Sequence, residues 1–159
     1  MRNYLIITAA VLILFSCDKE RDNYKDTEIY LKVIKNINDC QDIKDCIEFS
    51  DNRGDSVSVP GKPEGFTSKV NPDKWVKWMS AKDSDPKIKI LEVYFKEVDG
   101  NVDILKEKKM KAKDKDSIVI GKVKPKKDSI KNLSIEYYTI VFSIDGIKDT
   151  IDPKLEFHR

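Results

Sequence analysis

Histidine is almost absent from this chain: of 159 residues, only His158 is a histidine, and it is the penultimate residue. A Ser-His-Asp triad or a multi-histidine zinc or copper site needs imidazoles held inside the fold, so neither is expected. Only six glycines are present, and none forms a phosphate-cradling loop. Paired carboxylates such as Asp149 and Asp152 have nothing to set them apart from solvated acidic side chains. The sequence therefore predicts no enzyme activity, no metal site and no cofactor.

Charge of one sign is also lacking. Lys and Arg number 30 and Asp and Glu 28, so the formal net charge is only +2. Binding to a phosphate backbone needs a strongly basic face, and nucleic acid is therefore not an expected partner. Lysines do cluster locally, within residues 106–113 and 122–127. Two interpretations remain open for them: contact with anionic lipid headgroups or acidic polysaccharide, or, as we favour, a charged edge that prevents strand-to-strand aggregation.

Apolar runs long enough to cross a bilayer, which take about 20 residues in a helix, are missing too. The longest, Leu5 to Phe15, is interrupted only by Thr8, follows Arg2 and ends near the small residue Ser16. A basic start, a short apolar stretch and a small residue at the cut are typical of a secretory signal. The alternative is a buried N-terminal helix or strand of a cytosolic protein.

The segment Leu14-Phe15-Ser16-Cys17 resembles the lipobox of bacterial lipoprotein signal peptides, with Cys17 as the first mature residue. The resemblance implies that residues 1–16 are removed and that Cys17 receives diacylglycerol and a further acyl chain such as palmitate. Three acyl chains would hold a protein stably on a membrane. The resemblance thus implies the membrane as a partner through the lipid anchor. It also implies a location in the cell envelope, at the outer membrane, facing the periplasm or the exterior.

The rest of the chain divides into a tether and one domain. Residues 18–26 contain one aromatic residue, Tyr24, and no aliphatic residue, so residues 17–26 are expected to form a lipidated cysteine and a flexible charged tether. Residues 27–159 have the length of a single domain. Their short alternating apolar runs, separated by turn residues, predict an all-β fold, an antiparallel β-sandwich of Ig-like or cupredoxin-like type.

Strands are expected at residues 29–34, 47–49, 57–59, 88–95, 102–105, 117–123, 133–144, 147–151 and 155–157. The apolar phase switches at Ile90-Leu91, which indicates a bulge, and Asp145-Gly146 predicts a hairpin turn. Residues 71–81 are ambiguous, because Asn71-Pro72 suits a helix start while the residues after it alternate imperfectly, as in a strand. We favour the strand.

The C-terminal run Tyr138-x-Ile140-x-Phe142-x-Ile144-x-Gly146, followed by Asp152-Pro153, resembles the end of the DP-EP family of small bacterial β-sandwich proteins. There a final hairpin leads into an Asp-Pro motif that closes the sandwich. Residues 57–60 and 76–78 are similar to the early strands of cupredoxin-like sandwiches, but the paired histidines of a copper site are missing. These resemblances imply a fold and no activity.

With Cys17 lipidated, two cysteines remain, Cys40 and Cys46, in a compartment that permits disulfides. A disulfide is the favoured interpretation. A zinc site has poor spacing here, because five residues separate the cysteines and no histidine is near. Two reduced, inert thiols are the other alternative.

Two interpretations also remain for Trp75 and Trp78: core residues, as we favour, or a platform on which sugar rings stack. The sequence as a whole predicts a lipid-anchored envelope protein with a non-enzymatic domain that binds a partner or supports an envelope complex. The alternative is a carbohydrate-binding accessory lipoprotein. The expected partners are an envelope protein or a polysaccharide.

Overall fold

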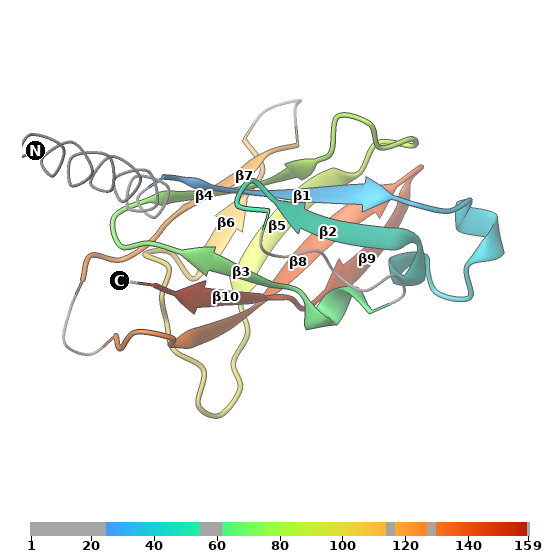
Figure 1. The fold of residues 1–159 in the computed structure, drawn as a ribbon. Helices are drawn as coiled ribbons and strands as arrows, with labels where there is room; N and C mark the ends of the chain where they lie inside the picture. Colours follow the sequence, from blue (N-terminus) through green and yellow to red (C-terminus); the bar gives the residue numbers. More distant parts are fainter. Residues whose placement is uncertain (1–24, 55–61, 114–116, 127–129, 159) are drawn as a thin grey trace, which may run out of the picture.

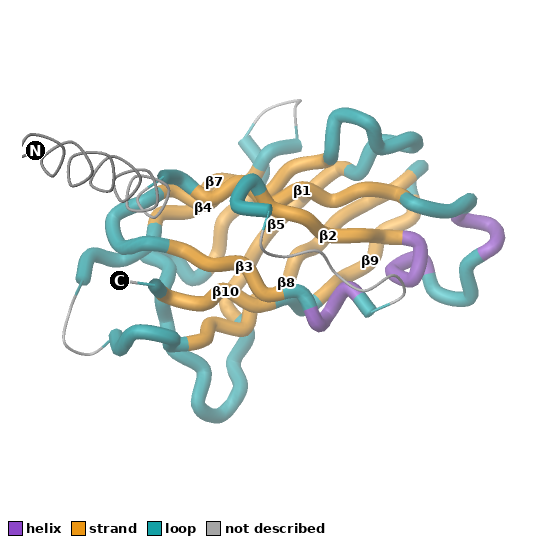
Figure 2. Tube along the Cα trace, viewed as in Figure 1, coloured by secondary structure: helices purple, strands orange, loops and turns teal. Residues whose placement is uncertain are grey.

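The computed structural model describes residues 25–54, 62–113, 117–126 and 130–158, which form ten strands and three short 3-10 helices (Figures 1 and 2). The strands are β1 (Thr27–Val33), β2 (Ile47–Asp51), β3 (Thr67–Val70), β4 (Trp75–Ser80), β5 (Lys89–Phe95), β6 (Lys109–Lys111), β7 (Val119–Lys122), β8 (Ile135–Ile144), β9 (Ile147–Ile151) and β10 (Lys154–Phe157). The helices are η1 (Ile37–Asp39), η2 (Ile43–Cys46) and η3 (Pro63–Gly65). The prediction of an all-β fold is confirmed. The strand expected at 57–59 falls outside the described residues, as does Cys17.

The strands form two sheets around one shared core (Figure 1). One sheet has the order β2-β1-β4-β7, and the other has the order β3-β10-β8-β5-β6, with β9 also paired to β8. Ile29 and Trp78 from the first sheet and Tyr138 and Phe142 from the second are all fully buried in this core. Alternation along each strand supplies these inward side chains, because successive residues of a strand point to opposite faces.

Both sheets are mixed, so the predicted antiparallel arrangement holds only in part. Strand β1 pairs parallel to β4, with Thr27 opposite Val76, and β3 pairs parallel to β10, with Thr67 opposite Lys154. The cause lies in the chain path. After β2 the chain crosses to β3 in the other sheet and then returns as β4, which enters beside β1 in the same direction.

Strand β8 is the centre of the larger sheet, and two turn predictions around it are confirmed. Its pairing with β5 shifts register between Ile90 and Glu92, where the apolar phase of the sequence switches. The β8–β9 hairpin turns at Asp145 and Gly146, whose φ angles are 49° and 88°. Positive φ at both central residues suits the twist of a two-residue hairpin and favours glycine at the second of these positions.

After β9 the chain passes through Asp152-Pro153 and continues in the same direction along β8 as β10. The Asp152 carboxylate fixes this connection, because its Oδ1 accepts the Thr139 hydroxyl at 2.6 Å and its Oδ2 pairs with the Lys96 ammonium group. A final hairpin followed by an Asp-Pro connection is thus present in the structure.

The alternation pattern in the sequence did not predict β3. It also predicted a strand at 102–105, where the structure has none. In β3 the inward residues include Ser68, whose hydroxyl donates to Asp51 Oδ2 at 2.6 Å, so no apolar pattern marks the strand. At 102–105 the buried Ile104 and Leu105 donate their backbone N–H groups to the Glu136 carboxylate instead of a strand ladder.

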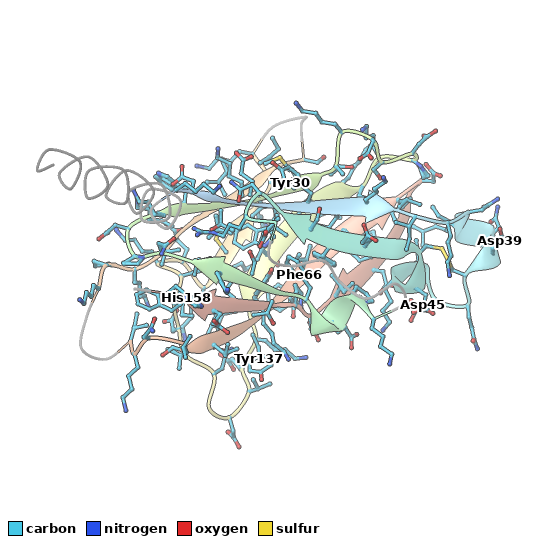
Figure 3. All side chains as sticks on the ribbon, viewed as in Figure 1. Tyr30, Asp39, Asp45, Phe66, Tyr137 and His158 are labelled. Atoms are coloured by element: carbon cyan, nitrogen blue, oxygen red, sulfur yellow. A yellow bond between two sulfur atoms is a disulfide. The ribbon has the colours of Figure 1, made fainter. Side chains whose placement is uncertain are left out.

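The two ends of the described chain lie at the same end of the molecule. Asn71 links the two ends. Its side-chain Nδ2 donates a hydrogen bond to the His158 carbonyl at 3.2 Å, and its Oδ1 accepts one from the Arg53 guanidinium group. The same guanidinium group also donates to the Lys25 carbonyl. Figure 3 shows His158 towards this end, with Asp39 at the opposite end. The ambiguous segment 71–81 contains β4 and no helix, so the favoured strand is confirmed, and the Asn71 side chain ties the chain ends instead of capping a helix.

Candidate functional site

A groove of about 800 Å³ lies where β4 and β7 of the smaller sheet approach β6 of the larger one. We call it the Trp75 groove, and its lining includes Asp26, Trp75, Lys77, Lys111, Lys113 and Ile120. Trp75 and Ile120 are among the exposed large apolar side chains, with 45% and 38% of their surface accessible. Register pairs Trp75 with Lys122 and Lys77 with Ile120, so lysines alternate with apolar side chains on this outer face.

Trp75 is held by contacts on two sides. Its backbone N–H donates to Asp26 Oδ1 at 2.9 Å, which ties the start of β4 to the residue before β1. The Lys122 ammonium group lies 4.6 Å from the centroid of its ring and also donates to the Asp73 carbonyl. A cation over an indole face is attracted by the ring quadrupole. The Trp75 ring is therefore partly fixed while it stays accessible from solvent.

Trp78 cannot share in such a surface, so the two tryptophans form no common stacking platform. The favoured prediction that both are core residues is confirmed for Trp78 and wrong for Trp75, which is 45% exposed. The Trp78 side chain is fully buried, and its indole N–H donates to the Tyr138 hydroxyl at 3.2 Å. The two rings meet edge to face, with centroids 5.6 Å apart. Burial is the largest cause that raises the pKa of the Tyr138 hydroxyl, which keeps it protonated. Trp75 is exposed and Trp78 is buried because residues three apart on a strand point to opposite faces.

The lysines of the Trp75 groove divide into paired and unpaired groups. Lys77 lies 3.1 Å from Glu28 Oε1 and Lys109 lies 2.8 Å from Glu92 Oε1. Within the described ranges, Lys111 and Lys113 form no ion pair, and both are exposed.

Glu28 also accepts the Tyr30 hydroxyl at 2.6 Å, and this bond raises the pKa of Tyr30 to about 12. The same bond, helped by Lys77, lowers the pKa of the Glu28 carboxyl. Lys77 and Glu28 therefore neutralise each other. The lysines of the groove that have no ion pair within the described residues, Lys111 and Lys113, lie on its β6 side, where Glu107 also lines it.

One carboxyl group lies inside the fold. Glu136 is 1% exposed, and its Oε2 accepts the N–H groups of Ile104 and Leu105, the latter at 2.8 Å. Burial raises the pKa of Glu136 to about 7, although the two backbone donors act in the opposite direction. Nearby, Lys124 pairs with Asp103 at 2.7 Å. The sequence analysis did not single out Glu136. Its position in the same alternation as Tyr138 and Ile140 is the signal that could have placed it on the inner face.

Comparison with known proteins identified no relative of this chain. A scan against protein-family models and a search of curated proteins found no significant match to this chain. Any functional conclusion therefore depends on the residues themselves.

The predicted disulfide between Cys40 and Cys46 is present, with Cα atoms 6.0 Å apart. It closes residues 40–46, which contain η2 and directly follow η1, at the end of the molecule marked by Asp39 and Asp45 in Figure 3. Side chains cap both short helices: Asn36 Oδ1 accepts the Asn38 N–H and Asp42 Oδ1 accepts the Lys44 N–H. The short η2 turn keeps the cysteines close, whereas six residues of regular helix would separate them by about 9 Å.

The remaining candidate groups are dispersed. In the described part of the chain, no three His, Cys, Asp or Glu side chains gather as potential metal ligands. His158 is half-buried near the end of the chain, since its N–H donates to the Val70 carbonyl at 2.8 Å and its ring contacts Glu156. Among the described residues, no helix has the length and apolar character needed to cross a membrane.

Proposed function

We propose that this protein is a lipid-anchored component of the bacterial cell envelope, whose β domain acts by binding and not by catalysis. The observation that carries the proposal is Cys17 at the end of a short apolar run and before a charged segment. A thiol in this setting is the acceptor of diacylglycerol in lipoproteins, so the proposal assigns to Cys17 the role of membrane anchor.

The geometry of the domain is consistent with a tethered binding module. Strand β1 starts at Thr27, only a short stretch beyond Cys17, so the folded domain would stay near the bilayer. The Trp75 groove is open and holds exposed apolar and cationic side chains, which are means of binding and not of bond cleavage. We also propose that the two sheets belong to a sandwich of the cupredoxin-like or DP-EP type, supported by the final hairpin and the Asp152-Pro153 connection that follows it.

The anchor is tested by Cys17→Ala in the full chain expressed in a Gram-negative host. We expect the wild type to partition into the detergent phase of a phase-separation assay and to carry a labelled fatty acid. The variant should carry no labelled fatty acid and remain uncleaved by the lipoprotein peptidase. Cys40→Ala with Cys46→Ala is the matched control, since it removes the other two cysteines and leaves the anchor. Equal fatty-acid labelling of wild type and Cys17→Ala would overturn the proposal.

The face of the outer membrane on which the domain resides is a second part of the proposal. The charged run Asp18-Lys19-Glu20 resembles surface-export signals of some Gram-negative bacteria, and we propose exposure to the exterior. Protease added to intact cells should then remove the mature domain, while a periplasmic marker protein stays intact. Full protection of the domain would refute surface exposure and leave the periplasmic side.

A further inference from the structure

The Trp75 groove lies beside the point from which the tether departs. Asp26 lines the groove, and its carboxylate accepts a hydrogen bond from the backbone N–H of Trp75. The chain that leads towards Cys17 therefore leaves from the rim of the groove. The tether from Asp18 to Asp26 is nine residues long and can span at most about 30 Å. With Cys17 in the bilayer, the Trp75 groove is thus among the parts of the domain held nearest to the lipid surface.

The apolar side chains of this face suit the boundary between lipid headgroups and acyl chains. Register places Trp75 and Ile120 as diagonal neighbours on adjacent strands, and both point outwards. Tryptophan is enriched at membrane interfaces, because its ring has an apolar body and a polar N–H. Ile120 adds aliphatic surface next to the ring. A soluble sugar ligand would gain little from an isoleucine, whereas an acyl-chain boundary would cover it.

Cationic side chains give this face charge complementarity to an anionic membrane, against which the lining carboxylates Asp26 and Glu107 act. Lys111 and Lys113 project from the β6 side of the groove, exposed and without an ion pair within the described ranges. Lys122 contributes a third cation above Trp75. A lysine close to an anionic bilayer surface is worth about 1 kcal/mol of binding. Three of them, added to the apolar pair, would favour one orientation of a domain that is already tethered.

We propose that the Trp75 groove binds anionic phospholipid headgroups and so docks the domain against the membrane that holds it. The inference rests on the proposed lipid anchor at Cys17. In the docked state, the Trp75 ring lies at headgroup depth, Lys111 and Lys113 contact lipid phosphates, and the disulfide-closed end of the molecule points away from the bilayer. That distal end is then the part presented to other components of the envelope.

The test couples the mature chain, which starts at Cys17, to a maleimide lipid in vesicles through the Cys17 thiol. The other two cysteines are joined in the disulfide, so the coupling is specific. Because the anchor is installed chemically, the outcome does not depend on lipidation in cells, and failure here is distinguishable from failure of the anchoring proposal. One set of vesicles contains phosphatidylcholine alone, and the other contains equal parts phosphatidylcholine and phosphatidylglycerol. Both carry brominated acyl chains, which quench nearby tryptophan.

The reporter is Trp75, with Trp75→Phe supplying the background emission of the buried Trp78. We expect quenching of Trp75 in the phosphatidylglycerol vesicles, a weaker effect in neutral vesicles, and loss of the difference at high salt. The double variant Lys111→Glu with Lys113→Glu should lower the ratio of docked to undocked domain by at least about tenfold. Lys35→Glu with Lys148→Glu, at the disulfide end and on β9, is the charge-matched control and should behave like wild type.

Three results would overturn the proposal: equal quenching in both kinds of vesicle, no quenching at all, or equal effects of the two double variants. Thermal unfolding of each variant establishes that the fold is intact, which is expected because the four lysines are exposed. A soluble polyuronate is added in a parallel arm. A shift of Trp75 emission with polyuronate and none with anionic vesicles would assign the groove to an acidic polysaccharide and refute the lipid contact.

Discussion

Trp75 and Trp78 stand three residues apart on β4, yet they belong to two different regions of the molecule. Trp78 lies between the sheets with no accessible surface, and its N–H is satisfied by the Tyr138 hydroxyl. Trp75 lies on the outer face, 45% exposed, beneath the Lys122 ammonium group. The parity of a position on a strand, and not the residue type, therefore decides whether a side chain stabilises the fold or remains available for binding.

The neighbours of the two tryptophans differ in the same way. On the inner side, a Cβ at Gly121 would lie 2.6 Å from Met110 Sδ and 3.2 Å from the Trp78 ring, so a side chain there would require Met110 and Trp78 to move. On the outer side, Ile120 and Lys122 flank the same glycine and face solvent. The core side thus tolerates little change in volume, whereas the outer side can change without unfolding the domain.

The largest effect is expected for Trp78→Ala, which should lower the free energy of unfolding by about 3–5 kcal/mol. It leaves a cavity between the sheets and removes the partner of the buried Tyr138 hydroxyl. Trp75→Ala, the matched control on the same strand, should cost less than about 1 kcal/mol, because its surface is already partly exposed. Urea denaturation followed by circular dichroism measures both. Similar losses for the two variants would contradict the division of β4 into an inner and an outer side.

A second test uses pH on the core side. Burial raises the pKa of Glu136 from an ordinary value of 4.5 to about 7, so the folded state binds this proton more tightly than the unfolded state. The resulting stabilisation is fully present below pH 4.5 and is lost as the pH rises through 7, with a total change of about 3 kcal/mol.

Glu136→Gln keeps an oxygen that can accept the N–H groups of Ile104 and Leu105 but no longer titrates. We expect the free energy of unfolding of the variant to vary less between pH 4.5 and 8 than that of the wild type. Urea denaturation across this range gives both curves, with Glu48→Gln, a half-buried carboxyl on the edge strand β2, as the control. An unchanged pH dependence in Glu136→Gln would show that this carboxyl does not titrate in that range.

Removal of the disulfide, at the end of the molecule away from the Trp75 groove, should have an intermediate effect on stability. Cys46 is fully buried and Cys40 is half-exposed, so the bridge joins an inner position to an outer one. Closing so small a ring is worth about 2 kcal/mol by loop entropy. Cys40→Ser with Cys46→Ser should therefore lower the melting temperature by several degrees. The emission of Trp75 should stay unchanged, and a shift in it would mean that the two ends of the molecule are coupled.

The sequence predicted the parts of the fold in which apolar residues alternate cleanly. The long β8 strand, its hairpin at Asp145-Gly146 and the bulge near Ile90 all follow from patterns of local residues. Strand β3 was missed because its inward position is occupied by Ser68, whose burial is compensated by a hydrogen bond to Asp51. The parallel pairing of β1 with β4 could not be predicted, since it depends on the chain crossing between sheets at β3, which no local pattern encodes.

The candidate site was predicted only in pieces. Trp75 and the lysines between 106 and 113 were each noted in the sequence, but their meeting in one groove depends on β6 approaching β4 and β7 across the corner of the two sheets. Ile120 appeared only as one residue of an alternating strand. Whether a tryptophan faced in or out depended on the register of β4, and the imperfect alternation of its residues left that register undecided.

The smallest expected effect on stability concerns the outer face alone. Lys122→Ala removes the cation above Trp75 and should lower the free energy of unfolding by about 0.5–1 kcal/mol, the range of an exposed cation–π contact. Because Lys122 also donates to the Asp73 carbonyl, the single variant overstates the ring contact. A double-mutant cycle with Trp75→Leu isolates it, since only the coupling between the two side chains survives the subtraction. We expect a coupling of about 0.5 kcal/mol between residues 75 and 122 and none between Trp75 and Lys148, a control lysine on β9. A coupling of zero for the first pair would mean that Lys122 merely lies near the ring, and that Trp75 is held in place by its N–H bond to Asp26 alone.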